Sequence, residues 1–135
     1  MKKLSLQILV ILAVMFASYS AFAFEAVTIT EPLNEATVSS PVTVCMEAWG
    51  VEVEPAKKGV NEGKGHNHIL IDSPLPADLG KPIAKNATHV HMGDGSRCKT
   101  LTLSPGKHTI RSLFAKGNHI PYNPALTDVI EITVK

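Results

Sequence analysis

The chain has 135 residues, with 13 Lys and Arg against 12 Asp and Glu, which gives a formal charge of +1 at neutral pH. This balance, with the basic residues scattered along the chain, excludes the electrostatic footprint of a protein that binds nucleic acid or an anionic membrane surface. The length is sufficient for one domain.

The first 23 residues have the three parts of a secretory signal peptide. Lys2 and Lys3 form a positive start, residues 4–16 are almost entirely apolar, and residues 21–23 read Ala-Phe-Ala, the small-x-small pattern that signal peptidase cuts. The apolar run is short for a membrane span. We therefore expect cleavage after residue 23, export to the periplasm or beyond, and one domain over residues 24–135. Losing both lysines leaves 11 Lys and Arg against 12 Asp and Glu, a formal charge of −1.

Helix signals are weak after residue 23, whereas short strand patterns recur between turn residues. Strands are predicted at residues 27–29, 37–46, 66–72, 88–92, 98–103, 108–114 and 129–134, with residues 51–53 extending or following the second. Pro41 interrupts that second strand, as proline does at a strand start or an edge.

Seven or so short strands in about 110 residues predict an all-β fold, an immunoglobulin-like antiparallel β-sandwich. Residues 31–44 and 101–110 resemble strands and turns of bacterial immunoglobulin-like modules. Residues 73–87 and 115–124 are long predicted loops, where functional residues are most often found.

The two cysteines, Cys45 and Cys98, both follow the predicted cleavage point. An exported protein meets an oxidising environment, so the two are predicted to form a disulfide that closes a loop of about 54 residues. A different interpretation is that these sulfurs bind Cu(I), a soft ion, together with Met46 or Met92. Met46 points away from Cys45 on an alternating strand, and the sequence therefore favours the disulfide.

Four of the six histidines form two His-x-His pairs, His66 with His68 and His89 with His91. Side chains alternate along a strand, so each pair projects from one face of its strand. Two such pairs on neighbouring strands would bring four imidazoles together, and a shell of nitrogen ligands suits copper or zinc. The alternative is that these rings are surface or hydrogen-bonding residues that stabilise one end of the sandwich.

Three more residues near these pairs are candidates for a role. His119 is predicted to reach the site from its long loop as a further ligand, or to be a loop residue fixed by Pro121. Asp72 would either orient a ligating imidazole or cap the turn that follows it. His108 is predicted to be structural, with its side chain bonded to a turn carbonyl. No nucleophile elbow, phosphate-binding loop or paired-carboxylate motif is present, so the sequence favours binding over catalysis.

Four blocks of the sequence together contain all six histidines: G-H-N-H-I-L-I-D, H-V-H-M-G-D-G, L-S-P-G-K-H-T-I and N-H-I-P-Y-N-P. In this order they resemble a family of small exported bacterial domains of unknown function, whose usual wording is G-H-H-H-L-L-I-D, H-x-H-F-G, L-P-P-G-K-H-T-L and N-H-x-P-H-x-P. The resemblance covers residues 42–135 and implies a fold and a histidine-rich face, without an activity. The chain departs from it at Asn67 and Tyr122, where the family usually has histidine.

The sequence thus predicts an exported protein that binds copper or zinc reversibly. The affinity is expected to fall below about pH 6, where imidazoles gain protons. The predicted metal ligands are His66, His68, His89, His91 and His119, with Asp72 behind them. The alternative is a non-catalytic interaction or adaptor module that binds an envelope protein without metal, because immunoglobulin-like folds host many unrelated functions.

Overall fold

The structure is a computed structural model that describes residues 24–135. The predicted signal peptide, residues 1–23, lies outside the described residues. Within residues 24–135, no helix is both long enough and apolar enough to cross a membrane.

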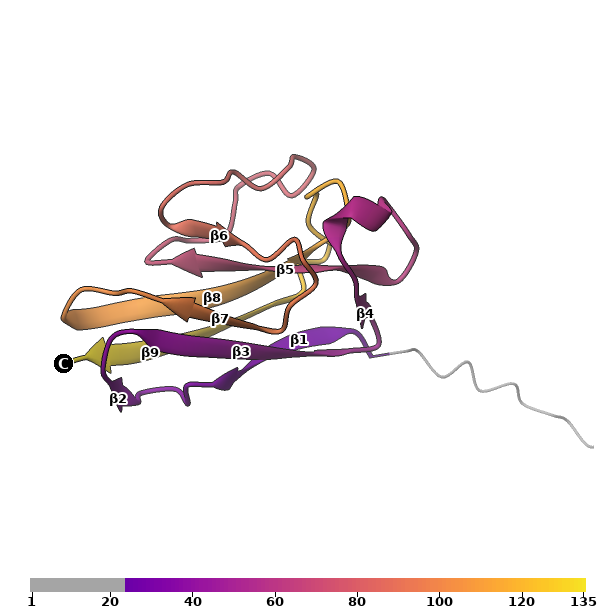
Figure 1. The fold of residues 1–135 in the computed structure, drawn as a ribbon. Coiled ribbons are helices and arrows are strands. Elements are labelled where there is room, and N and C mark those ends of the chain that lie inside the picture. The colour runs from indigo at the N-terminus through magenta and orange to yellow at the C-terminus, as the bar shows by residue number, and fades with distance from the viewer. Residues whose placement is uncertain (1–23) are drawn as a thin grey trace, which may run out of the picture.

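The described residues form two β-sheets packed face to face (Figure 1). One sheet has the strand order β1-β3-β7, and the other has the order β2-β9-β8-β5-β4 with β6 paired to β5. The elements are β1 (Ala26–Glu31), β2 (Thr37–Val38), β3 (Val42–Trp49), β4 (Glu52–Val53), the 3₁₀ helix η1 (Ala56–Lys58), β5 (Lys64–Ile71), β6 (His89–His91), β7 (Cys98–Leu101), β8 (Gly106–Ala115) and β9 (Thr127–Val134). The predicted all-β sandwich is confirmed. The described strands number nine. The two-residue strand β4 agrees with the prediction that residues 51–53 follow the second strand, and β2 is the separate first part of the predicted strand 37–46; they pair in parallel with β5 and β9.

The predicted strand at residues 37–46 is in fact two strands in different sheets. Residues before Pro41 form β2, which pairs with β9, and residues after it form β3, which pairs with β1 and β7. Proline has no backbone N–H for a ladder hydrogen bond and has a fixed φ, so a continuous central strand cannot pass through it. Pro41 therefore marks the point where the chain crosses from one sheet to the other.

The predicted disulfide is confirmed. Cys45 on β3 and Cys98 on β7 are opposite each other in the antiparallel register of the three-stranded sheet, and their sulfurs are bonded. Because both sulfurs are in this bond, they are not free to bind Cu(I). The histidine pairs lie in the other sheet, on β5 and β6.

The main core lies between the two sheets. Alternate residues of the facing strands are buried there, among them Val44 and Met46 of β3 and Ile69 of β5. A second, smaller apolar cluster lies on the other face of the six-stranded sheet and consists of Leu70, Ile83, Leu113 and Ala115. Strand β5 is thus buried on both faces, because the chain also covers the side that points away from the sandwich.

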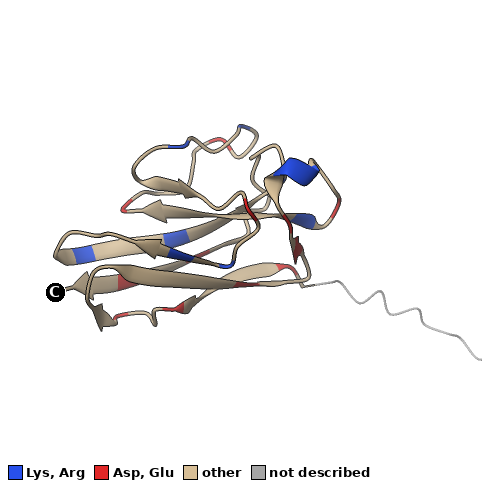
Figure 2. Cartoon of the chain, in the orientation of Figure 1, with Lys and Arg blue, Asp and Glu red and all other residues tan. Residues whose placement is uncertain are grey.

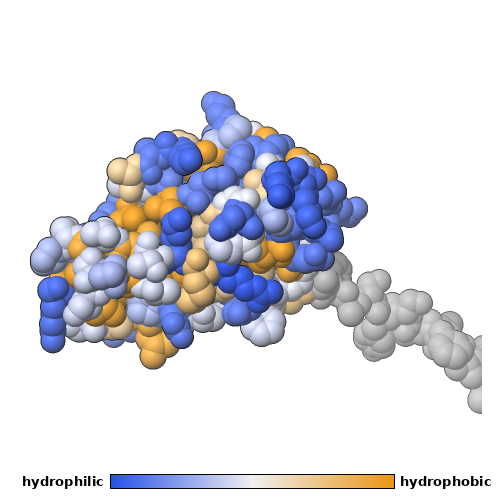
Figure 3. Space-filling view, viewed as in Figure 1, coloured by the Kyte–Doolittle hydropathy of each residue, from blue (hydrophilic) through white to orange (hydrophobic). Residues whose placement is uncertain are grey.

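Two long loops provide that cover. The connection 73–88 and the loop 116–126 stand above β5 and β6 in Figure 1. The backbone N–H of Ile83 donates to the carbonyl of His119 across 2.9 Å, which ties one loop to the other. Acidic and basic residues are interspersed along the chain (Figure 2), and hydrophilic side chains crowd the end that carries η1 and these loops (Figure 3). Between the two loops and the outer face of the sheet lies a small cavity that opens to solvent.

Candidate metal centre

The first histidine pair lies on the outer face of β5. His66 and His68 alternate with Asn67 along the strand, so the two imidazoles point toward the covering loops and Asn67 shares the face of Ile69 and the main core. The two histidines are 0% and 2% exposed. Histidine is seldom so completely buried, and here two of them are buried side by side.

Strand β6 brings in a third ring. Its antiparallel register on β5 places His91 directly opposite His68. The His91 ring lies over Gly93, where an added Cβ would collide with three atoms of the imidazole, Cε1, Nε2 and Nδ1. The glycine two residues after His91 therefore has a specific role, since only a residue without a side chain leaves room for the ring.

The loop 116–126 contributes the fourth ring, His119. Its backbone has φ of +66°, in the left-handed region that costs a residue with a side chain about 1–3 kcal/mol. Two backbone hydrogen bonds hold it there: its N–H donates to the Lys116 carbonyl across 2.8 Å, and its own carbonyl accepts from Ile83. The covering loops thus hold the His119 ring over the histidines of β5.

The four rings surround a common point. One possible ligand nitrogen from each of them lies within 4.8 Å of the other three. The six separations between ring centroids run from 4.7 to 6.0 Å. Four rings at the corners of a planar square would have two long diagonal separations. Here the longest centroid separation, His68 to His119, is 6.0 Å, but the separation between the other two rings, His66 and His91, is only 5.0 Å. The rings therefore occupy the corners of a distorted tetrahedron.

Hydrogen bonding within the protein accounts for little of this arrangement. One bond joins two rings, between His66 Nε2 and His119 Nδ1 at 3.2 Å. The buried nitrogens His66 Nδ1, His68 Nδ1 and His91 Nε2 have no protein partner. A buried polar atom without a partner costs about 1–3 kcal/mol, so this cluster is expensive unless something else contacts the rings.

The surroundings keep the buried rings neutral. Burial, reinforced by the neighbouring imidazoles, lowers the pKa of His68 to about 3 and that of His66 to about 4. Partial burial, followed by the charges of His119 and Lys85, also lowers the pKa of His91. Neutral imidazole is the form that coordinates a metal, because its free nitrogen lone pair is the ligand.

A cavity of about 280 Å³ adjoins the cluster. Its lining consists of His68, Ile83, Ala84, Lys85, His91 and His119. No acidic side chain lines it, so the site offers nitrogen ligands without carboxylates. The cavity provides a path by which an ion can reach the rings from solvent.

His89 was predicted as a ligand, and the structure does not bring it into the group. In the register of β6 it lies opposite Leu70, two pairs further along than His91. Its Nδ1 is 3.1 Å from Asn86 Oδ1 and 3.0 Å from Thr88 Oγ1. His89 therefore serves the turn at residues 86–89, although it shares a face with His91.

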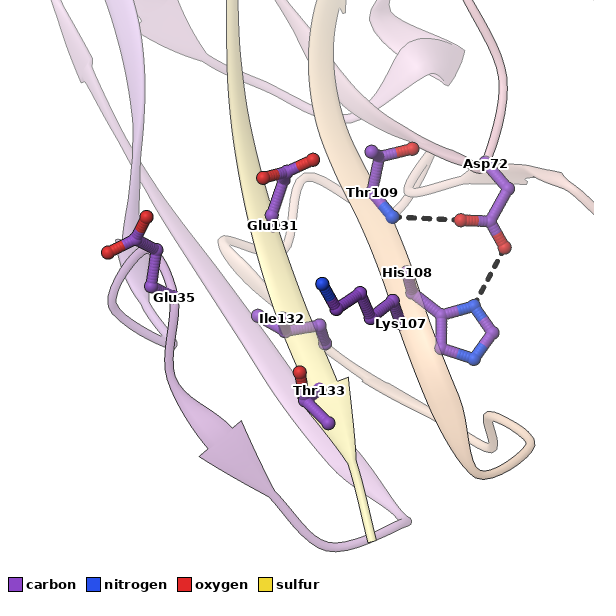
Figure 4. A pocket seen from close by; sticks show the side chains of 8 residues that line it. All are labelled: Glu35, Asp72, Lys107, His108, Thr109, Glu131, Ile132 and Thr133. Carbon is purple, nitrogen blue, oxygen red and sulfur yellow. Dashed lines mark hydrogen bonds and ion pairs between the residues drawn. The ribbon is translucent and has the colours of Figure 1, made fainter.

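Asp72 was predicted as an orienting partner for a ligand, and its hydrogen bonds go elsewhere. The Nδ1–H of His108 donates to its Oδ2 across 2.7 Å, and the backbone N–H of Thr109 donates to its Oδ1 across 2.8 Å (Figure 4). Nε2–H of His108 donates to the carbonyl of Ser104 across 2.8 Å, which confirms the prediction of a turn-carbonyl bond. Because both ring nitrogens donate, His108 is an imidazolium, and it joins the end of β5 to the turn before β8.

The pKa values of this pair follow from the same contacts. Hydrogen bonds to Asp72 and to Ser104 raise the pKa of His108. Partial burial acts to raise the pKa of Asp72, but the hydrogen bonds from His108 and Thr109 outweigh it, and the pKa is lowered. The pair is thus a structural link outside the four-histidine cluster.

Three residues that lie against the cluster or its cavity were not singled out from the sequence. Gly93 lay between the predicted strands 88–92 and 98–103, and Ile83 and Lys85 lay in the predicted long loop 73–87. The placement of Gly93 two residues after a His-x-His pair was the available signal. For Ile83 and Lys85 the sequence contains none, since their role depends on how the loop folds back over the sheet.

Comparison with known proteins yields one finding. A family described as a domain of unknown function (DUF4399) matches residues 44–135, which contain all four clustered histidines. No curated protein and no solved structure matches the chain.

Proposed function

We propose that this chain, which belongs to the DUF4399 family of domains of unknown function, binds a divalent transition-metal ion, zinc or copper. The ligands are His66, His68, His91 and His119. Binding is reversible, and the protein acts in holding or delivering the ion in the periplasm. The predicted signal peptide and the disulfide, a feature of oxidising compartments, support this location.

The observation that carries the proposal is the convergence of four imidazoles, three of them with buried nitrogens that have no protein hydrogen-bond partner. In a purely structural cluster these nitrogens would be paired with donors or acceptors, as His108 is with Asp72 and Ser104. A metal ion at the common point would take one ring nitrogen of each imidazole as a ligand and offset the cost of burying the rings.

Zinc fits the arrangement of the rings better than copper does. Zn²⁺ favours four ligands in a tetrahedron at about 2.0–2.1 Å, which would draw the nitrogens to separations of about 3.3 Å. The observed limit of 4.8 Å requires the rings to move inward slightly. Cu²⁺ has the greater general affinity for imidazole but favours a tetragonal arrangement, so both ions are tested.

Calorimetric titration with Zn²⁺ and with Cu²⁺ tests the function on protein prepared without a histidine tag. A matched pair of variants comes from strand β6: His91→Ala removes a proposed ligand, and His89→Ala removes a histidine two residues away that lies outside the cluster. We expect one ion per chain for the parent and for His89→Ala, and at least tenfold weaker binding for His91→Ala. Parent binding no tighter than millimolar, or equal binding by both variants, would contradict the proposal.

The pH range of binding is expected to differ from that predicted from sequence. Ordinary imidazoles would lose metal below about pH 6. Because burial lowers the pKa of His66 to about 4 and that of His68 to about 3, protons compete for these two rings only in more acidic solution. Retention of the ion at pH 5.5 would support this reasoning.

A further inference from the structure

The cavity touches only one side of the histidine cluster. Three rings line it, those of His68, His91 and His119, whereas His66 does not. In a tetrahedron of rings, these three form one triangular face, and His66 lies at the opposite corner. A molecule that enters from the cavity therefore reaches the centre of the cluster through this face.

A tetrahedral ion accepts a fifth ligand through such a face. Zinc expands to five-coordinate in some sites, and the incoming ligand then lies opposite the fourth protein ligand. The rings of His91 and His119 are half-buried, while His66 and His68 are buried, so the open side of the cluster is the side of the cavity. The geometry offers a coordination position that the protein does not fill with its own side chains.

The charge of the cavity determines what that ligand would be. Lys85 lines the cavity and is exposed at its rim, and within residues 24–135 it makes no ion pair. Asp94 is the carboxylate whose charge acts on His91, and its Oδ1 accepts the backbone N–H of Ser96 at 2.9 Å. Neutral imidazoles leave the charge of a bound dication uncompensated, and Lys85 adds another positive charge. An anion is therefore attracted to this position.

We propose that the metal ion in this site takes a small anion from the cavity as a fifth ligand, opposite His66, and that Lys85 strengthens its binding. This proposal rests on the proposed metal binding. The volume of about 280 Å³ admits an anion of a few heavy atoms, such as a carboxylate, beside the water that a space of this size contains. It is smaller than the pockets of about 300–1,000 Å³ that usually hold larger ligands.

The probe is azide added to the Cu²⁺-loaded full chain, because azide bound to copper produces a charge-transfer absorption band. Acetate added afterwards competes for the same position and reports on carboxylates. Lys85→Gln removes the charge at the rim. Lys81→Gln is the matched control, since Lys81 lies in the same connection, pairs with Asp78 at 3.4 Å and does not line the cavity.

We expect the band to appear with the parent and with Lys81→Gln, and acetate to reduce it. We expect Lys85→Gln to weaken azide binding by about three- to tenfold, as for one partly screened charge near the ligand. The affinity for Cu²⁺, measured separately by calorimetry, is expected to be unchanged in Lys81→Gln and no weaker in Lys85→Gln, because removing a positive charge beside the site does not reduce the attraction of a cation.

The outcomes separate this proposal from the proposed function. A parent that binds neither Zn²⁺ nor Cu²⁺ overturns both. Binding of Cu²⁺ without an azide band overturns the fifth-ligand position alone and leaves a closed four-histidine site. An azide affinity that is equal in Lys85→Gln and Lys81→Gln overturns the role of Lys85.

Discussion

Gly93→Ala tests the position of the His91 ring without changing any ligand. The φ of Gly93 lies outside the left-handed region, so the backbone itself accepts alanine. The new Cβ, however, would collide with three atoms of the His91 imidazole. Imidazole is rigid and planar, so the whole ring has to turn away, and because His91 is half-buried it can turn toward solvent.

The expected effect on metal binding is large and the effect on the fold is small. Turning His91 outward leaves three of the four proposed ligands in place. Loss of a group that merely orients a ligand costs about 10–100-fold in metal affinity, so loss of the ligand itself is expected to cost about 100-fold, or about 2.7 kcal/mol. The displaced ring loses some packing, for which we expect about 1 kcal/mol in the free energy of unfolding.

Zinc titration by calorimetry, with urea unfolding of the metal-free protein, measures both quantities. Gly80→Ala is the control, because it lies in the covering connection and its Cβ meets only the carboxylate end of Asp78 at 3.0 Å. If Gly93→Ala binds zinc within threefold of the parent while Gly80→Ala does the same, His91 is not a ligand and the reasoning fails.

Three further predictions concern stability. The folded pKa of His68 is about 3, so the unfolded chain gains this proton first as the pH falls below 6.5. This ring therefore lowers the free energy of unfolding of the metal-free protein by up to about 1.4 kcal/mol per pH unit between pH 6.5 and 4. Urea unfolding at pH 7 and at pH 5 should show a smaller loss of stability between the two pH values for His68→Leu than for the parent. The raised pKa of His108 and the lowered pKa of Asp72 make the hydrogen bond between them most stabilising between about pH 4 and 6.5. His108→Gln is expected to lower the free energy of unfolding by about 1 kcal/mol at pH 5.5 and by less at pH 9. An equal loss at both pH values, measured by thermal unfolding, would contradict this. Replacing both cysteines of the Cys45–Cys98 disulfide by serine is expected to lower the free energy of unfolding by about 4 kcal/mol and to leave the zinc affinity unchanged. A loss of zinc affinity in this variant would contradict the prediction and show that the cluster depends on the three-stranded sheet.

Local patterns determined much of this protein by themselves. Alternation of apolar residues and frequent turn residues predicted the β-sandwich, because side-chain direction in a strand depends only on sequence parity. The same parity placed His66 and His68 on one face of β5. The pairing of Cys45 with Cys98 followed from there being two cysteines in a chain expected to be exported.

Contacts between distant segments decided the membership of the cluster. His89 and His91 are equivalent in local pattern, and only the register of β6, which sets Val90 opposite Ile69, puts His91 beside His68 and His89 beside Leu70. Register depends on long-range pairing and packing, which periodicity does not encode.

The same holds for the groups contributed by loops. His119 enters the site because its loop is tied to Ile83, 36 residues earlier, and Asp72 leaves it because His108, 36 residues later, binds its carboxylate. Each contact joins segments whose closeness results from the packing of the whole sheet and its covering loops. Sequence thus identified the histidines as candidate ligands, and tertiary structure selected which of them share one point in space.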